Sequence, residues 1–292
     1  MIAGIDLGGT QVRVAVAGSD GTIGGRAKAS TAALGGPEGM VRWTAGNIER
    51  LTGGRRLRAV GIGVPGPCDP KTGTLINPPN LTGWPKNLPL ARLLEQELRA
   101  AVHLENDANL AAVAEHQRGA GKGANDLAYV TWSTGIGSGL ILGGRLHSGA
   151  HGSAGEVGHM VLDPKGPLCA CGMHGCTEAY ASGSTLARKM GRPAAEVFAA
   201  ARQGDPRSLQ VVEEAAGMVG QALMNLANLV DPELIVIGGG ITNSWALVRR
   251  ALYEPIKTSP FITRNRKPRL VRAALGTQVG LVGAVEWARL NL

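Results

Sequence analysis

The chain has 292 residues, a net charge of +8, 44% hydrophobic residues and 18% charged residues, a composition that provides a sizeable core and excludes a disordered chain. At about 150 residues per domain, this length predicts two domains or one large one. The basic charge is compatible with nucleic-acid binding, but only 3% of the residues are aromatic and the basic residues are scattered, which favours a basic surface suited to an anionic substrate such as a nucleotide.

No stretch of the sequence approaches the roughly 20 apolar residues that a membrane-spanning helix needs. Residues 1–6 lack the basic start and the long apolar region of a signal peptide. We therefore expect a cytoplasmic protein with no membrane partner, in which the four cysteines are poor candidates for disulfides. Three of these cysteines lie within eight residues, which suggests a metal site instead.

The first part of the chain alternates short apolar runs with segments of helical spacing. A strand ends in a glycine turn and a second strand follows, while Pro65-Gly66-Pro67 stops a later strand. A long irregular loop around residues 78–85 then leads into a helix. The expected strands span residues 2–7, 12–16, 57–64 and 101–104, and the expected helices span residues 37–51 and 88–101.

The second part of the chain repeats the opening plan of strand, polar glycine turn and strand, at residues 127–142. This repetition hints at two related halves. Alternating strands and helices predict an α/β fold, and two such units predict two lobes with a ligand-binding cleft between them. The other expected strand spans residues 234–237, and the expected helices span 108–119, 194–201, 208–229, 244–256 and 279–290.

Two glycine turns, at residues 6–10 and 134–137, have the residue types of a phosphate-binding site. Glycines let backbone N–H groups approach phosphate oxygens closely, a threonine adds a hydroxyl donor, and Asp6 could hold Mg²⁺ directly or through water. The first turn is neither a Walker loop, because no Gly-Lys-Ser/Thr follows, nor a Rossmann fingerprint, because a strand follows it.

The alternative for each turn is an ordinary hairpin, although two turns at corresponding positions favour a nucleotide between the lobes. A run of glycines at 238–240, after a later strand, marks a helix start, a ligand contact or both. The candidate phosphate- and ATP-binding residues are Asp6, Gly8, Gly9, Thr10, Thr134, Gly135 and Gly239.

Glu105, Asn106 and Asp107 follow an expected strand and precede an expected helix. In one interpretation Asp107 is the N-cap of that helix. In the other it is a general base, because phosphoryl transfer to a hydroxyl needs a carboxylate within hydrogen-bond reach of the attacking oxygen. Asn106 offers both a donor and an acceptor for sugar hydroxyls.

A cluster of cysteines and histidines follows the segment Glu156-Val157-Gly158-His159. Zn²⁺ takes four ligands in a tetrahedron, and closed Cys/His sets are structural. His159, Cys169, Cys171 and Cys176 supply one imidazole and three thiolates, while His174 is a rival fourth ligand crowded between two of the cysteines. The alternative is a reduced, metal-free cluster. Cys68 is interpreted as a buried thiol outside the site.

These motifs, in this order over nearly the whole chain, resemble the ROK family of bacterial sugar kinases (repressor, open reading frame, kinase), and its glucokinases in particular. Residues 156–159 match the family's Glu-x-Gly-His signature, and residues 169–178 match its Cys-x-Cys-Gly-x-x-Gly-Cys-x-Glu signature without departure. The two glycine turns resemble the family's two phosphate motifs.

The resemblance implies an actin-like (ribonuclease H-like), two-lobed α/β fold with a cleft between the lobes. Residues 1–107 would form a small lobe, and residues 108–276 would form a large lobe with the zinc site. The C-terminal helix, at about residues 277–292, would pack back on the small lobe. Family members are commonly homodimers or homotetramers.

The resemblance also implies roles for individual residues. Asp107 would take the proton from the 6-hydroxyl of the sugar, and His159 would face zinc with one ring nitrogen and sugar with the other. The zinc would be structural, and Mg²⁺ would come with ATP. The implied sugar-binding residues are Asn80, Asn106, Asp107, Glu156, His159 and Glu178.

The implied reaction is the phosphorylation of D-glucose by MgATP to glucose 6-phosphate. The alternatives are a kinase for fructose, mannose, N-acetylmannosamine or N-acetylglucosamine, a polyphosphate-dependent kinase, and a non-catalytic sugar-binding regulator. ROK repressors carry an N-terminal helix-turn-helix region, whereas this sequence starts directly at the first kinase strand. We therefore expect no nucleic-acid partner.

Overall fold

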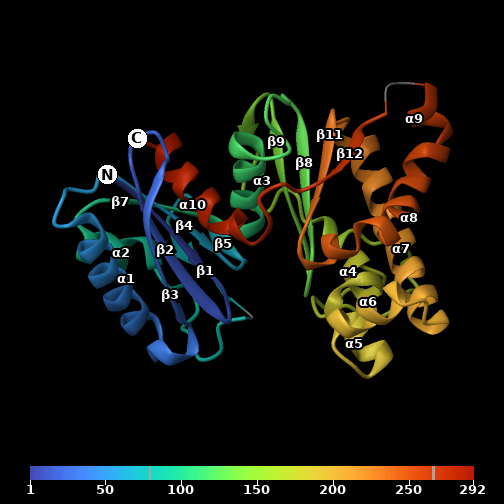
Figure 1. Cartoon of the computed structure of the whole chain (residues 1–292), viewed down its shortest axis with the longest axis horizontal. Coiled ribbons are helices and arrows are strands. Elements are labelled where there is room, and N and C mark those ends of the chain that lie inside the picture. Colours follow the sequence, from blue (N-terminus) through green and yellow to red (C-terminus); the bar gives the residue numbers. More distant parts are fainter. Residues whose placement is uncertain (79, 265–266) are drawn as a thin grey trace. The chain divides into compact units, whose positions relative to one another are not determined.

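The computed structural model describes residues 1–78, 80–264 and 267–292, so that Pro79 of the irregular loop lies outside the described residues. The chain divides into two compact units (Figure 1). Each unit has a five-stranded sheet of parallel and antiparallel strands with helices packed on it, which is the α/β arrangement expected. The helices of the described part of the chain include none with the length and apolar character that crossing a membrane requires.

The boundaries of the units do not follow one cut in the sequence. The first unit comprises Met1–Gly119, Ser148–Ala154 and Thr277–Leu292, and the second comprises Ala120–His147 and Gly155–Gly276. The expected boundary at residue 107 assigned the helix that begins at Asp107 to the large lobe. In the structure, this helix is part of the first unit. The C-terminal helix is also part of it.

The sheet of the first unit has the strand order β3-β2-β1-β4-β7. Its first three strands form an antiparallel meander, whereas β4 is parallel to β1 and β7 is parallel to β4. The carboxyl ends of the three parallel strands therefore meet at one edge, where Asp6, Gly63 and Glu105 are neighbours in register. The strands are β1 (Ile2–Leu7), β2 (Gln11–Ala17), β3 (Ile23–Ser30), β4 (Ala59–Val64) and β7 (Ala101–Asn106), and a small hairpin is formed by β5 (Cys68–Asp69) and β6 (Thr74–Leu75).

Helices cover both faces of this sheet. On one face, α1 (Pro37–Thr52) and α2 (Leu90–Leu98) bury apolar side chains against those of β1 and β2, with the short η1 (Ala32–Leu34) before α1. On the other face, α10 (Val279–Leu290) packs on β1 and β4, and α3 (Asp107–Arg118) packs on α10. A Cβ on Gly61 of β4 would be 2.1 Å from the carbonyl oxygen of Ala284, so a glycine there lets α10 approach the sheet closely.

The sheet of the second unit has the strand order β10-β9-β8-β11-β12. Its first three strands are antiparallel, and β11 is parallel to both β8 and β12. Both sheets thus follow one plan, an antiparallel meander extended by two parallel strands, which confirms the two related halves. The strands are β8 (Leu127–Trp132), β9 (Ile136–Leu142), β10 (Arg145–Leu146), β11 (Leu234–Gly238) and β12 (Arg269–Arg272).

The long helix α7 (Pro206–Val230) organises the core of the second unit. It packs against α4, α6 and α8, and its Val219, Leu223 and Leu226 are buried. In the same core, Trp132 and Phe198 meet edge to face, with ring centroids 6.2 Å apart. The remaining helical elements are η2 (Val157–His159), α4 (Thr177–Ala181), α5 (Gly183–Met190), α6 (Ala194–Arg202), η3 (Gly240–Ser244), α8 (Trp245–Thr258), α9 (Pro260–Arg264) and, between the units in sequence, η4 (Gly276–Gln278).

Several expectations about secondary structure need correction: the strand expected at residues 140–142 begins at Ile136, and β12 was not expected. The helix expected at residues 88–101 ends at Leu98, because Arg99 takes a left-handed conformation (φ 51°) and Ala101 already begins β7. The strand expected from residue 57 begins at Ala59. The strand β3, whose residues alternate between half-buried and exposed, was not expected.

Candidate active site and metal centre

The first glycine turn joins β1 to β2 and is held by hydrogen bonds on both sides. The backbone N–H of Gly8 donates to the carbonyl of Gln11 at 2.9 Å. Thr31 donates twice, from its backbone N–H to the carbonyl of Thr10 at 3.0 Å and from Oγ1 to the carbonyl of Gly8 at 2.7 Å. These bonds fix the turn and leave Gly9 and Thr10 exposed, where an anionic ligand can reach their N–H groups.

Asn80 lies against this turn. A Cβ on Gly9 would stand 2.5 Å from the carbonyl oxygen of Asn80, so only glycine fits at that position without displacing the neighbouring backbone. Asn80 itself is exposed. Within the first unit, one candidate sugar ligand is therefore next to a candidate phosphate turn.

Asp6, at the end of β1, already has a cationic partner. It is 8% exposed, and Nη2 of Arg13, its direct cross-strand neighbour, donates to its Oδ2. Nη1 of the same arginine donates to the carbonyl of Thr277 at 2.6 Å. Burial raises the pKa of the Asp6 carboxyl, and the guanidinium of Arg13 opposes that rise. A contact between Asp6 and Mg²⁺ would have to displace Arg13 or pass through water.

Asn106, not Asp107, caps helix α3. The side-chain Oδ1 of Asn106 accepts from the backbone N–H groups of Ala108, at 2.9 Å, and of Asn109, at 3.3 Å. Asp107 is the first helical residue and is exposed. The interpretation of Asp107 as the N-cap is therefore wrong. The cap also occupies the acceptor of Asn106, which leaves its amide N–H₂ as the group that suits a sugar hydroxyl.

The second glycine turn is anchored on the start of α5. The backbone N–H of Ser133 donates to the carbonyl of Gly135 at 2.9 Å. The carbonyl of Thr134 accepts from the backbone N–H of Ser184 at 3.0 Å and from its hydroxyl at 3.1 Å. The side chains of Ser133 and Thr134 are exposed, as a ligand-binding turn requires.

A cavity of about 500 Å³ opens beside this second turn, entirely within the second unit. This volume falls in the usual range for small-molecule sites. Nη1 of Arg202 donates to the hydroxyl of Ser244 at 2.5 Å in its wall. The lining combines the polar residues Ser133, Thr134, Ser184, Arg202, Asn243 and Ser244 with Ala187, Ala194, Ala195, Phe198 and Ile241 and the glycines Gly183 and Gly240.

Of these lining residues the sequence predicted only Thr134. Ser133 lies beside Thr134 on the turn, and the others come from α5, α6 and η3, which are separated along the chain and carry no phosphate-binding motif of their own. The glycine run before η3 was the one available signal, since Gly240 lines the cavity.

Gly239 has a packing reason to be glycine. Its φ is 87°, and a Cβ there would be 2.2 Å from the carbonyl oxygen of Trp132. Both the left-handed conformation and the close approach exclude other residues. Gly239 precedes η3, so the glycine run serves a helix start packed on β8, and a ligand contact of Gly239 itself remains a prediction.

Glu178 is tied to the second glycine turn. It lies in the first turn of α4, half-buried, and its Oε2 accepts from the backbone N–H of Ile136 at 2.8 Å. Glu156 is exposed and directly precedes η2. The candidate sugar ligands thus come from both units, with Asn80, Asn106 and Asp107 in the first and Glu156, His159 and Glu178 in the second.

The structure brings His159, Cys169, Cys171 and Cys176 together. Their four donor atoms all lie within 4.8 Å of one another. The Sγ atoms of Cys171 and Cys176 are 3.7 Å apart, and Sγ of Cys169 is 3.8 Å from Nδ1 of His159. Tetrahedral zinc with Zn–S bonds of about 2.3 Å has sulfur–sulfur edges of about 3.8 Å, so this donor set fits Zn²⁺. Nδ1 is the ring nitrogen of His159 that faces the sulfurs, so the metal would not need Nε2.

His174 is not part of this group. Its Nδ1 is 2.9 Å from the carbonyl oxygen of Gly166. The backbone bridge between Leu168 and His174 keeps it within the loop that the cysteines span.

The thiols of the cluster differ in their acidity. Burial, with neighbouring thiols, raises the pKa of Cys176 to about 12, and burial also raises the pKa of Cys169. The backbone N–H of Met173 lowers the pKa of Cys171, which is exposed. Zinc binds thiolates, so binding to this cluster would release protons.

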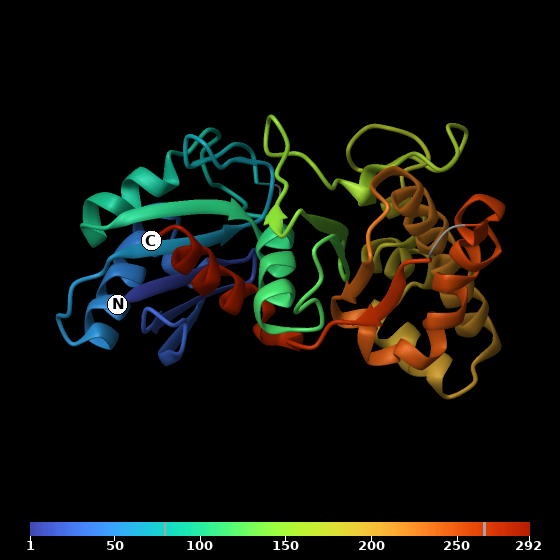
Figure 2. The ribbon, with the colours of Figure 1, turned by 90° about the horizontal axis from the view of Figure 1, so that it is seen from above.

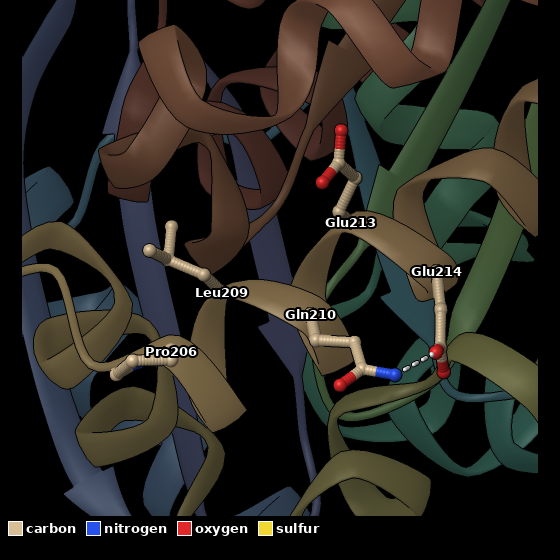
Figure 3. A pocket seen from close by; sticks show the side chains of 5 residues that line it. All are labelled: Pro206, Leu209, Gln210, Glu213 and Glu214. Atoms are coloured by element: carbon tan, nitrogen blue, oxygen red, sulfur yellow. Dashed lines mark hydrogen bonds between the residues drawn. The ribbon is translucent and has the colours of Figure 1, made fainter.

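A second hollow lies along the first turns of α7 (Figure 3). It is lined by Pro206, Leu209, Gln210, Glu213 and Glu214, and Nε2 of Gln210 donates to Oε1 of Glu214 at 2.9 Å. All five residues belong to one helix, and none of the predicted site residues lies there.

Comparison with known proteins gives a consistent result. The family model described as "ROK family" matches residues 2–290. The glucokinase of Streptomyces coelicolor is 35% identical over 98% of this chain and 96% of its own length, and the N-acetylmannosamine kinase of Yersinia pestis (strain Pestoides F) is 34% identical over 99% and 98%. The crystal structure of a ROK family glucokinase from Streptomyces griseus in complex with glucose and AMPPNP superimposes with a TM-score of 0.82, at 33% identity over 99% of both chains.

The similarity in three dimensions confirms the actin-like α/β fold that the motifs implied. The match extends over nearly every residue and includes relatives above 30% identity. This chain therefore belongs to the ROK family.

Proposed function

We propose that the protein is an ATP-dependent hexose kinase that phosphorylates the 6-hydroxyl of D-glucose. Asp107 accepts the proton of the 6-hydroxyl as its oxygen attacks the γ-phosphorus of ATP. The bond between that phosphorus and the β,γ-bridging oxygen breaks, and glucose 6-phosphate and ADP leave. Such transfer depends on positioning and on the neutralisation of phosphate charge.

The observation that carries this proposal is the cavity of about 500 Å³ beside the second glycine turn. Its size and its mixed lining suit the nucleoside part of ATP, with the base against Ala187 and Phe198 and polar groups such as Ser184 and Asn243 at its edge. Thr134, on the turn itself, would reach the phosphates.

The exposed position of Asp107 supports its role as the base. Asn106 provides the side-chain cap of α3, and Asp107 is the exposed first residue of that helix. Like the turn at Gly8, it follows a strand of the parallel part of the first sheet.

The zinc would have a structural role and would take no part in the reaction. His159, Cys169, Cys171 and Cys176 would complete a closed tetrahedron, in which zinc fixes the segment from Glu156 to Glu178. Glu156, His159 and Glu178 are proposed to bind sugar hydroxyls, together with Asn80 and Asn106. Mg²⁺ would enter with ATP, since Asp6 is engaged by Arg13.

Formation of the sugar phosphate tests this proposal. Glucose, fructose, mannose, N-acetylmannosamine and N-acetylglucosamine should each be offered with ATP, GTP or polyphosphate. We expect the highest kcat/KM with glucose and ATP. A higher value with N-acetylmannosamine would favour the activity of the Yersinia pestis relative. Sugar binding without any phosphorylation would favour a regulator. We also propose that the protein forms a homodimer or a homotetramer, which sedimentation of the same sample tests.

A further inference from the structure

Glu105 is a buried carboxylate near the end of β7, two residues before Asp107. It is 1% exposed. Its Oε1 accepts from the backbone N–H of Asn106 and from Nδ2 of Asn109, both at 2.9 Å. Its Oε2 accepts from the hydroxyl of Ser148 at 2.8 Å. Three donors therefore converge on a single side chain.

The bonds through Oε1 hold the beginning of α3. Asn106 is the cap of that helix and Asn109 lies in its first turn, so Glu105 fixes the backbone on either side of Asp107. Figure 2 shows β7 (teal) ending where α3 (green) begins. Because Asp107 stands at the first position of the helix, its direction depends on how this junction is held.

The bond through Oε2 holds a different part of the chain. Ser148 opens the segment Ser148–Ala154, which belongs to the first unit although its sequence neighbours belong to the second. Nζ of Lys71 donates to the carbonyl of Ala150 at 2.8 Å, and a Cβ on Gly152 would be 2.8 Å from Cδ of Pro70. The segment ends just before Gly155 and Glu156 in the sequence.

The neighbouring Asn109 shows that this arrangement has a cost. Its Oδ1 is buried and has no hydrogen-bond partner among the described residues. A buried acceptor without a partner is unfavourable. The opposite orientation of the amide would turn Oδ1 towards the carboxylate, so the orientation is dictated by the bond from Nδ2 to Glu105.

We propose that Glu105 is a positioning residue for phosphoryl transfer. It sets the direction of the Asp107 carboxylate by holding the start of α3 and the Ser148 segment with its two oxygens. The inference rests on the proposed hexokinase-type function, because it assigns Glu105 a part in that same reaction. A base that is misplaced by about 1 Å loses on the order of 100-fold in rate.

Two substitutions separate geometry from charge. Glu105→Gln keeps the length of the side chain, since its carbonyl can accept from Asn106 and Asn109 and its amide can donate to the Ser148 hydroxyl. Glu105→Asp keeps the charge but is one methylene shorter, so it cannot reach all three donors. Positioning predicts that the kcat of the Gln variant stays within about threefold of wild type, and that the kcat of the Asp variant falls by at least about tenfold. The KM values for sugar and ATP should change little.

Glu286 supplies the matched control. It is also 1% exposed, and it accepts from Nε of Arg118 at 2.7 Å and from Nε of Arg289 at 2.6 Å. Arg118 is the last residue of α3, so this carboxylate holds the opposite end of the same helix. Glu286→Asp should lower the unfolding midpoint without lowering kcat, measured well below that midpoint.

The order of the two Glu105 variants decides the outcome. An Asp variant with kcat equal to or above that of the Gln variant would overturn the positioning role. So would an equal loss of kcat in Glu286→Asp, because that result would mark a general effect of stability. A wild-type protein that phosphorylates no hexose would instead refute the proposed function, and this inference with it.

Discussion

Glu178 accepts a hydrogen bond from the backbone N–H of Ile136, in the second glycine turn, at 2.8 Å. A proposed sugar ligand is thereby joined to a proposed phosphate-binding turn. A Cβ on Gly135 would lie 2.7 Å from Oε2 of Glu178. The glycine of this turn therefore has a role besides access for phosphate, because it leaves room for the carboxylate.

Gly135→Ala should consequently impair sugar binding more than stability. The new methyl group meets the flexible end of Glu178. This carboxylate can move away, but it then leaves its position beside the backbone N–H of Ile136. We expect KM for glucose to rise roughly tenfold, the loss of about one charge-assisted hydrogen bond, with little change in the unfolding midpoint. Gly46→Ala, in α1 with no atom within 4 Å of the new Cβ, is the control for sugar binding: KM should not change, and the unfolding midpoint should rise slightly because alanine replaces a glycine inside a helix. An unchanged KM in the Gly135 variant would argue against Glu178 as a sugar ligand.

Asp107→Ala should sharply reduce turnover and leave the fold intact. General bases contribute about 10²- to 10⁴-fold in rate, so kcat should fall by that factor, while glucose binding measured by calorimetry persists. Because Asn106 and not Asp107 caps α3, the unfolding midpoint should barely move. Turnover near the wild-type value would exclude Asp107 as the base.

Asn106→Ala, unlike Asp107→Ala, should lower the stability of the protein. Loss of the cap leaves the N–H groups of Ala108 and Asn109 without their acceptor and costs about 1 kcal/mol. Asn106→Asp restores the cap acceptor but removes the amide donor, so it should recover stability without recovering sugar affinity. Chemical denaturation, combined with KM for glucose, distinguishes these two contributions.

The zinc site predicts about one zinc per chain and an affinity that rises with pH. Thiols must lose their protons to bind zinc, and the pKa of Cys176, at about 12, lies far above neutrality. Affinity should therefore fall as pH is lowered from 8 to 6, and a chelator should lower the unfolding midpoint. Cys176→Ser should lose the metal, whereas His174→Ala should keep it. Metal-free protein that is folded and fully active would contradict a structural role.

The periodic elements of this fold were predictable from sequence, because their apolar spacing reflects burial on one sheet face. The helix at residues 279–290 and the strand at residues 2–7 have the bounds that their patterns indicate. The strand β3 has only a weak apolar pattern, since its half-buried positions hold one isoleucine, one glycine and two alanines and none of its residues is fully buried. It forms because β2 offers it a ladder of backbone hydrogen bonds.

The candidate site, too, could be predicted from the sequence only in part. The metal ligands lie within 18 residues of one another in the chain (159 to 176) and could be identified from spacing. Two neighbouring residues that can both cap a helix, Asn106 and Asp107, could not be told apart, because the choice depends on backbone angles. The cavity beside Thr134 could not be predicted, since it arises from the packing of helices that are distant in sequence.

The packing of α10 on β1 and β4 also determines when the first unit can complete its core during translation. This helix covers Ile2, Ala15 and Ala59 of the first sheet, yet the ribosome makes it after every residue of the second unit. A nascent chain therefore exposes one face of its first sheet throughout the synthesis of residues 120–276. The half of the protein that is translated first is the last to complete its core.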